Sequence, residues 1–197
     1  MHWVIAVGLL LYTVIPFISP ILFETGHPRL GWYIQTMYSF FCHQRPERSI
    51  FLFGEQITYS MQDLLPYGYN GGLDGYTFVG NKNLGYKAAF CVRDTFLYGS
   101  MSIVGISILA MRKNIRIHWA WSIILCVPLI LDGGLQFLSE FLYLSRDFLG
   151  IDLAKPFYLS NNVKRAVTGI LFGTGVAVFL FNELTIALRK DAGVNDT

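Results

Sequence analysis

The sequence predicts an all-α membrane protein, a bundle of four transmembrane helices with one short interfacial or half-helix. Of its 197 residues, 53% are hydrophobic and only 14% are charged, and the mean hydropathy is +0.46. A soluble domain usually has about 25% charged residues. The 16 Phe, 11 Tyr and 4 Trp suit helices that face lipid and are anchored by aromatic rings at both interfaces.

The first predicted span is residues 3–23, which contain no charged residue. At about 1.5 Å per residue, a helix of this length covers the hydrocarbon core of roughly 30 Å. We expect it to be retained as a helix, because no basic segment precedes it and no small-residue cleavage site follows it. Pro16 and Pro20 predict a kink in its second half.

The next uncharged stretch, residues 30–43, is too short to cross a bilayer and predicts the interfacial or half-helix. Pro46 disfavours helical geometry at Arg45, so the helix is expected to end at the sequence Cys42-His43-Gln44. Glycines interspersed with Asn, Asp and Tyr between residues 54 and 87 predict turns and an aqueous loop.

Three more spans are predicted at residues 95–111, 119–139 and 166–188, interrupted only by Asp132 and Glu183. Gly169 and Gly173 form a small-xxx-small pair in the last of them. Such a pair predicts a surface on which another helix packs closely.

Charge bias between the loops predicts the orientation in the cell membrane. The turn between the second and third spans and the end of the fourth are basic, so both are expected to be cytoplasmic. Both termini are then cytoplasmic. Residues 1–188 form one transmembrane domain with an external loop at 44–90, and residues 189–197 form a short cytoplasmic tail. The basic residues that carry this inference are Arg112, Lys113, Arg116, Arg189 and Lys190.

The third span has a polar stripe, with Asp132, Gln136 and Glu140 spaced four residues apart. An acid inside a span costs at least about 2.5 kcal/mol, so Asp132 should face the bundle and be paired. Arg165 is the expected partner, with Arg93 as the second choice. Two interpretations stay open: a structural ion pair that fixes helix register, or a ligand or proton site.

Cys42 and Cys91 are predicted to meet at the outer face, and three interpretations of them stay open. They can form a structural disulfide, remain free redox-active thiols, or bind zinc together with His43 and Asp132. The absence of C-x-x-C and H-x-x-x-H spacing counts against the metal site. Cys126 lies mid-span and is interpreted as a small core residue.

Several arginines are expected near the outer interface, where guanidinium groups suit phosphate or carboxylate. An anionic lipid headgroup is therefore a candidate ligand, and the alternative is that these side chains simply extend to the interface. The residues predicted to bind the ligand are Arg48, Arg93, Asp132, Gln136, Asn162 and Arg165.

The sequence resembles an uncharacterised family of prokaryotic membrane proteins known only as a domain of unknown function. The residues that carry the resemblance are Cys42-His43-Gln44, Arg48-Ser49-Ile50, Gly54, Cys91-Val92-Arg93, Asp132-Gly133, Gln136, Asn162, Arg165 and Thr168-Gly169. The segment between the two cysteines is longer than the resemblance implies, and Asp94-Thr95 stands where a second cysteine commonly follows the arginine. The resemblance implies a site but no activity.

The sequence thus predicts a multi-pass membrane protein with a polar pocket at the outer face that binds a metal ion or an anionic lipid headgroup. No catalytic residue is assigned. The alternatives are a membrane-embedded metal- or thiol-dependent enzyme and a small structural subunit of a membrane complex. Besides the bilayer, the partners considered are anionic lipid and other membrane proteins. Nucleic acid is excluded because the basic residues are scattered and the net charge is only +2.

Overall fold

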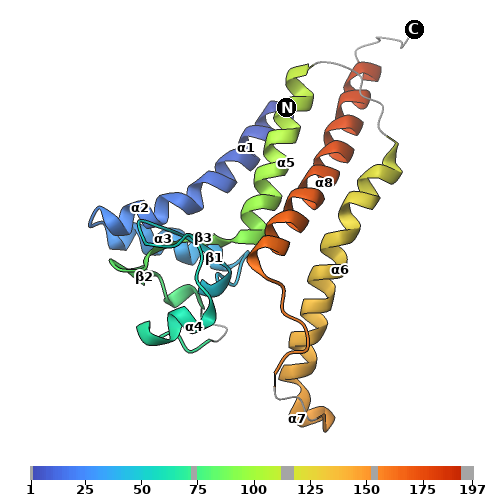
Figure 1. Ribbon diagram of the computed structural model, residues 1–197. Coiled ribbons are helices and arrows are strands. Elements are labelled where there is room, and N and C mark those ends of the chain that lie inside the picture. Colours follow the sequence, from blue (N-terminus) through green and yellow to red (C-terminus); the bar gives the residue numbers. More distant parts are fainter. Residues whose placement is uncertain (1, 72–74, 112–117, 152–154, 192–197) are drawn as a thin grey trace.

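The computed structural model describes residues 2–71, 75–111, 118–151 and 155–191 (Figure 1). Within these residues, four helices are long and apolar enough to cross a membrane, which confirms the predicted fold class. They cover Trp3–Glu24, Val92–Met111, Trp119–Leu144 and Asn162–Leu184. The corresponding elements are α1 (His2–Val14) with α2 (Ile18–Glu24), α5 (Val92–Met111), α6 (Trp119–Leu144) and α8 (Asn162–Asp191).

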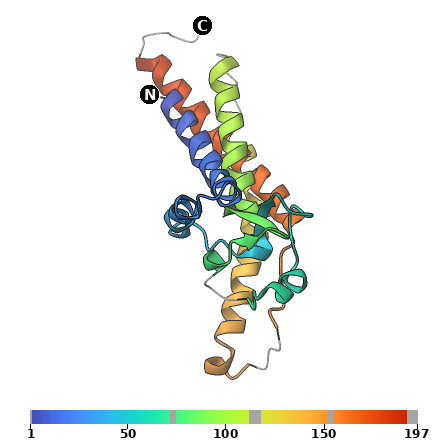
Figure 2. The same cartoon turned by 90° about the vertical axis from the view of Figure 1, so that its left-hand side faces the viewer.

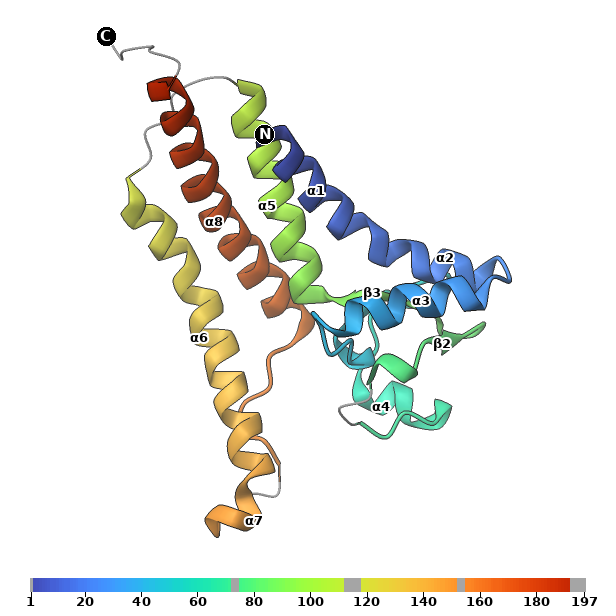
Figure 3. The same ribbon diagram turned by 180° about the vertical axis from the view of Figure 1, so that it is seen from behind.

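A 3₁₀ turn at Ile15–Phe17 separates α1 from α2, so the predicted interruption at Pro16 is confirmed. Proline lacks the N–H that an α-helix needs at this position. After α2 the chain turns back into α3 (Pro28–Ser39), where the Ser19 hydroxyl donates to the Gly31 carbonyl at 3.2 Å. The α2–α3 hairpin projects sideways from the bundle (Figure 3). α3 corresponds to the short interfacial or half-helix predicted at residues 30–43, but it ends at Ser39, before the predicted end at Cys42-His43-Gln44.

α8 lies between α5 and α6 (Figures 1 and 3), and its glycines explain the close approach. A Cβ atom added at Gly169 would lie 2.7 Å from the Arg93 carbonyl oxygen, and one at Gly173 would lie 2.1 Å from that of Leu97. The predicted small-residue surface is therefore confirmed, and its partner is α5. Gly175 faces the other way, where a Cβ would lie 2.8 Å from the Ser122 carbonyl oxygen of α6.

The segment between α3 and α5 contains a three-stranded antiparallel sheet of order β1-β3-β2, where the sequence predicted only turns and loop. Phe51 pairs with Lys87 and Asn81 pairs with Gly85. The prediction failed because β3 is buried almost throughout, and a strand covered on both faces lacks the alternation that marks strands in a sequence. The bounds are β1 Ser49–Leu52, β2 Gly80–Asn81 and β3 Gly85–Cys91, with short helices α4 Met61–Leu64 and α7 Arg146–Leu149.

Two small apolar clusters hold this segment together. One contains Phe51 and Leu84 with residues of the loop between β1 and β2. The other contains Tyr38, Cys42 and Phe90, and Tyr12 of α1 packs against it. The second cluster therefore joins β3 to α1 and α3.

Lys87 on β3 is fully buried and its ammonium contacts three acceptors. Its Nζ donates to Gln35 Oε1 at 3.2 Å, to the Gln44 carbonyl at 3.0 Å and to Gln44 Oε1 at 3.4 Å. The Gln44 backbone has a positive φ of 49°, which turns both groups toward the lysine. Burial lowers the pKa of Lys87 to about 7.

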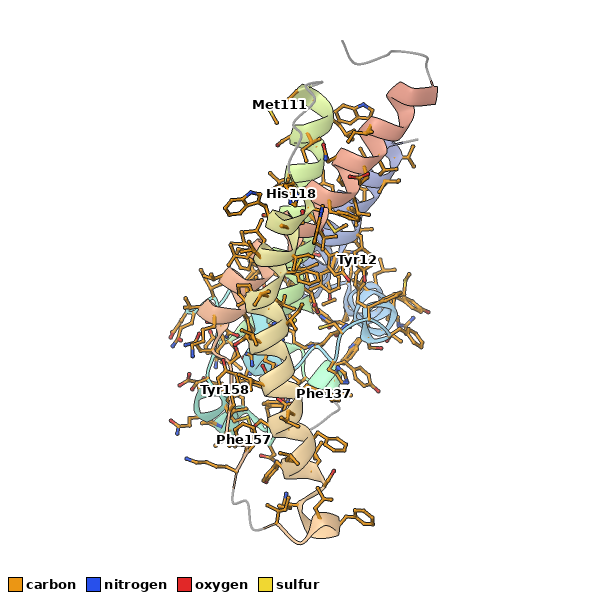
Figure 4. The ribbon with its side chains drawn as sticks, turned by 90° about the vertical axis from the view of Figure 1, so that its right-hand side faces the viewer. Tyr12, Met111, His118, Phe137, Phe157 and Tyr158 are labelled. Carbon is orange, nitrogen blue, oxygen red and sulfur yellow. The ribbon has the colours of Figure 1, made fainter. Side chains whose placement is uncertain are left out.

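α6 continues beyond the ends of α5 and α8, so its C-terminal half lies at the same end of the molecule as the sheet segment (Figures 1 and 2). Met111 lies at one end of the molecule and Tyr158 toward the other (Figure 4). α8 runs to Asp191, three residues into the segment expected to be a tail. The rest of that tail, and the basic turn at 112–117, lie outside the described residues.

Lys87 should make stability depend on pH. Its folded-state pKa of about 7 lies below the ordinary value of 10.5, so between these two pH values the unfolded chain carries a proton that the folded chain lacks. The free energy of unfolding should rise with pH across this window, by a few kcal/mol in total, and the contribution should be flat below about pH 7. Thermal unfolding of the full-length protein in detergent between pH 6 and pH 10 measures it.

The quantity compared is the pH dependence of the melting temperature in the wild type and in the variant Lys87→Met. This variant keeps an unbranched side chain but cannot titrate. Lys82→Met is the matched control, because Lys82 is exposed in the turn before β3. If the Lys87→Met and wild-type profiles run parallel across the window, the lysine is not neutralised by burial.

Candidate functional site

Asp132 lies at the centre of a polar network that joins three parts of the chain. The carboxylate is 7% exposed, and its Oδ2 accepts from Arg93 Nη2 at 2.5 Å and from the Ser160 hydroxyl at 2.9 Å. Its Oδ1 accepts from the Tyr158 hydroxyl at 2.6 Å. Tyr158 lies beside α6 (Figure 4). Asp132 is therefore paired and hydrogen-bonded at both oxygens, as a carboxylate in a span requires.

The expectation that Arg165 pairs with Asp132 is wrong, and Arg93, the second choice, is the partner. The reason lies in Gly133, where an added Cβ would lie 3.3 Å from Arg93 Nη1. The missing side chain gives the guanidinium of α5 room beside α6. Arg165 instead donates to Gln136 Oε1 at 3.3 Å and to Asn162 Oδ1 at 3.1 Å.

The stripe on α6 continues from Gln136 to Glu140 and there reaches the sheet segment. Gln136 Nε2 donates to Glu140 Oε1 at 2.8 Å, and the same oxygen accepts from Arg45 at 3.4 Å and from Arg48. Arg45 Nε also pairs with Glu47 at 2.9 Å. These ion pairs connect the C-terminal half of α6 to the turn that precedes β1.

Glu47 is itself held from two sides. The Tyr69 hydroxyl donates to its Oε2 at 2.8 Å, and Asn162 Nδ2 donates to its carbonyl oxygen at 3.1 Å. Burial and the nearby Glu47 charge raise the pKa of Tyr69 to about 12, so the phenol stays a hydrogen-bond donor. The start of α8 is thereby tied to the turn before β1.

A cavity of about 1080 Å³ opens between the sheet segment, the C-terminal half of α6 and the start of α8. Its size is that of a pocket for a small ligand. The charged residues that line it are Arg45, Glu47, Arg48, Asp63, Glu140 and Arg165. Asp132 and Arg93 do not line the cavity, so of the pair predicted to form its floor only Arg165 reaches it.

Arg165 differs from the other arginines of the cavity. It is only 5% exposed, and among the described residues it forms no ion pair with a carboxylate. Its hydrogen-bond partners are two neutral amides. The charges of Arg48 and Arg93 act on it unfavourably, whereas the more weakly acting charge of Glu47 favours it. The cavity wall therefore contains a buried positive charge that forms no direct ion pair within the described part of the chain.

Cys42 and Cys91 meet beside the network, as the sequence predicted. Cys42, Cys91 and Asp94 each have a potential ligand atom, and these atoms lie within 4.8 Å of one another. The Cys91 thiol donates to Asp94 Oδ2 at 3.0 Å, and all three cysteines are unpaired. A hydrogen bond with Cys42, together with burial, raises the pKa of Cys91 well above its ordinary value.

His43 does not join this group. Its side chain is exposed, whereas that of Cys42 is buried, because adjacent side chains leave the backbone in different directions. Asp132 is also absent from it and belongs to the arginine network. The ligand set expected from the sequence is therefore changed: Cys42 and Cys91 are brought together, and Asp94 stands where His43 and Asp132 were expected.

The six residues predicted to bind a ligand are brought into one region, although Arg93, Asp132 and Gln136 do not line the cavity. The sequence did not predict the roles of Tyr158 and Ser160, whose hydroxyl groups donate hydrogen bonds to the Asp132 carboxylate. Their hydroxyl groups immediately before Asn161-Asn162 were the available signal. Nor did the sequence predict the role of Lys87, for which a lysine inside a largely apolar segment was the signal.

Comparison with known proteins confirms the resemblance to an uncharacterised membrane-protein family. Residues 82–179 match the model of a family described as "Predicted membrane protein (DUF2085)". The match begins after Cys42 and Arg48 and includes the positions of Cys91, Asp132 and Arg165. Searches of curated proteins and of solved structures found no match.

Arg93 and Asp132 should be energetically coupled. Removing one partner leaves a poorly solvated charge, so Arg93→Gln or Asp132→Asn alone should destabilise the protein by about 3 to 5 kcal/mol. The double variant should lose less than the sum, with a coupling of roughly 1 to 3 kcal/mol. Thermal stability in detergent provides the measurement.

The matched control is the same cycle with Arg165→Gln in place of Arg93→Gln. Arg165 is connected to Asp132 only indirectly, because Gln136 accepts from both Arg165 and Arg93 and only Arg93 contacts the carboxylate, so that coupling should be smaller. A larger coupling for Arg165 than for Arg93 would restore the pairing first expected from the sequence.

Proposed function

We propose that the cavity binds an anionic group of the phosphate type, as found in the headgroup of an anionic lipid. The observation that supports this most directly is the buried guanidinium of Arg165 without a carboxylate partner among the described residues. Burial of a charge is costly unless another charge compensates it. An anion in the cavity would supply that compensation.

Four of the other charged residues of the wall form ion pairs with one another, and the fifth, Asp63, is held by hydrogen bonds from Ser60. Glu47 and Glu140 pair with Arg45 and Arg48, and Asp63 accepts from the Ser60 backbone N–H at 2.8 Å and from its hydroxyl at 2.7 Å. Arg165 is then the residue that an anion would neutralise. Guanidinium groups bind phosphate and carboxylate through parallel hydrogen bonds.

The position of the cavity suits a headgroup. Arg165 lies in the first turn of α8, near the end of a span, and the cavity is also lined by polar loop residues such as Thr58 and Asn70. A headgroup would enter from the interface while its acyl chains remain beside the apolar face of α6. That face includes exposed Leu135, Leu138 and Phe141.

Binding can be tested with the full-length protein in neutral detergent, to which phosphatidylglycerol, phosphatidylcholine or inorganic phosphate is added. An anion at about 100 times its Kd should stabilise the protein by about 2.7 kcal/mol. Phosphatidylglycerol should raise the melting temperature and phosphatidylcholine should not. A rise with inorganic phosphate alone would identify a free-anion site instead of a lipid site.

Arg165→Gln should remove this stabilisation while leaving the unliganded protein as stable as the wild type or more so, because it removes an uncompensated charge. Lys164→Gln is the matched control, since Lys164 is the adjacent residue, carries the same charge and is exposed. The proposal fails if both variants respond to phosphatidylglycerol like the wild type, or if both lose the response equally.

We also propose that both termini are cytoplasmic, which places the cavity at the outer face. Basic residues at the end of α8 and in the turn 112–117 support this orientation. In a Cys126→Ser background, a cysteine introduced at Asn70 should react with an impermeant thiol reagent in intact cells, whereas one introduced at Arg116 should not. The reverse labelling pattern would show that the protein has the opposite orientation in the membrane.

A further inference from the structure

Two thiols and a carboxylate meet at the start of α5, on residues that come from three different elements. Cys42 follows α3, Cys91 ends β3 and Asp94 lies in the first turn of α5. Their donor atoms all lie within 4.8 Å of one another. Cys42 and Cys91 are 49 residues apart in the sequence, so the fold, and not local spacing, creates the group.

The spacing is close to what a zinc-class ion needs. With Zn–S bonds of about 2.3 Å and Zn–O bonds of about 2.0 Å, tetrahedral ligands are separated by roughly 3.5 to 3.8 Å. Donor atoms within 4.8 Å of one another need to move inward by about 1 Å at most. Side-chain rotation alone can provide such a shift.

The surroundings hold the donors in place. Cys42 is packed in the cluster with Tyr38, Ala89 and Phe90, and Cys91 lies opposite Ser49 in the sheet. Cys91 and Asp94 are only partly buried, which leaves a path for an ion. Neither thiol is needed to fill the larger core around α5 and α8.

The charges also favour a bound cation. Two thiolates and one carboxylate carry three negative charges, and a divalent ion leaves a net charge of about −1. Thiols release their protons when they bind a metal, which makes such binding weaker at low pH.

We propose that Cys42, Cys91 and Asp94 form a site for a thiophilic divalent ion of the zinc class. Three protein ligands leave a fourth position for water or an incoming ligand, the arrangement of zinc sites that take part in chemistry. This site is separate from the anion cavity, whose lining contains none of the three residues.

Cobalt(II) provides the probe, because thiolate coordination gives a charge-transfer band in the near ultraviolet. The full-length protein, purified in detergent with a non-coordinating reductant and stripped of metal, should bind one Co²⁺ with this band, and Zn²⁺ should displace it. Cys42→Ser and Cys91→Ser should abolish the band. Asp94→Asn should weaken binding by more than the roughly 10- to 100-fold seen for residues that only support a ligand.

Two control variants test whether the third cysteine or the neighbouring histidine holds the ion instead. Cys126→Ser should bind like the wild type, because Cys126 lies at the contact between α6 and α8. His43→Ala should also bind like the wild type, since His43 is exposed. Elution volume and melting temperature establish that each variant is folded, and a Cys→Ser variant that fails this check is replaced by Cys→Ala at the same position.

Three results would overturn the proposal. Reduced wild-type protein that gives no thiolate band has no such site. Loss of the band in His43→Ala, with Asp94→Asn unaffected, would assign a different ligand set. Recovery of a Cys42–Cys91 disulfide by alkylation and peptide mass analysis, in protein isolated without oxidant and resistant to reduction when folded, would make the pair a structural bridge.

Discussion

The ion pair between Arg93 and Asp132 is the interaction on which the arrangement of the bundle near the sheet segment depends. A carboxylate inside a span must be compensated, and here the compensation comes from α5 and from the chain just before α8. Each of these parts is thereby fixed against α6. Gly133 on α6 and Gly169 on α8 give the space that this convergence needs, since a side chain at either position would crowd Arg93.

The sheet segment is attached to the bundle in two chemically different ways. On the side of α1 and α3 the contact is apolar and aromatic, with Tyr12, Tyr38 and Phe90 in mutual ring contact at 4.9 to 5.3 Å between centroids. On the side of α6 it consists of Arg45 and Arg48 against Glu140. The cavity lies beside this second, ionic contact. Ion pairs near an interface are weaker and more exchangeable than an apolar core, so the cavity wall is the more adjustable side.

Those features of the fold that depend on composition along one element could be predicted from the sequence. Uncharged stretches locate the four spans, the glycine spacing locates the face of α8 that packs on α5, and the single acid in a span requires a partner. β3 could not be predicted in this way, because a strand buried on both faces shows no alternation. Lys87 was missed for a related reason: its acceptors come from Gln35 and Gln44, which are remote in sequence.

The errors at the site have the same physical origin. Periodicity gives the face of a helix on which Asp132 lies, but not which of two arginines on other helices reaches it. Cys42 and His43 are neighbours in sequence, but their side chains leave the backbone in different directions, so that of Cys42 is buried and that of His43 is exposed. Asp94 entered the thiol group because it lies one helical turn after Cys91, so that its carboxylate returns to the sulfur at 3.0 Å.

The four residues 91–94 serve both regions at once. Arg93 is directed to Asp132 on α6, while its neighbour Asp94 is directed to Cys91. In a helix, consecutive side chains point about 100° apart, which allows one turn to face two environments. The first turn of α5 therefore connects the two regions. A rotation of this turn that tightens the contacts of Asp94 must also reposition the guanidinium of Arg93. By thermodynamic linkage, any ligand that favours one rotation would be felt equally from the other side.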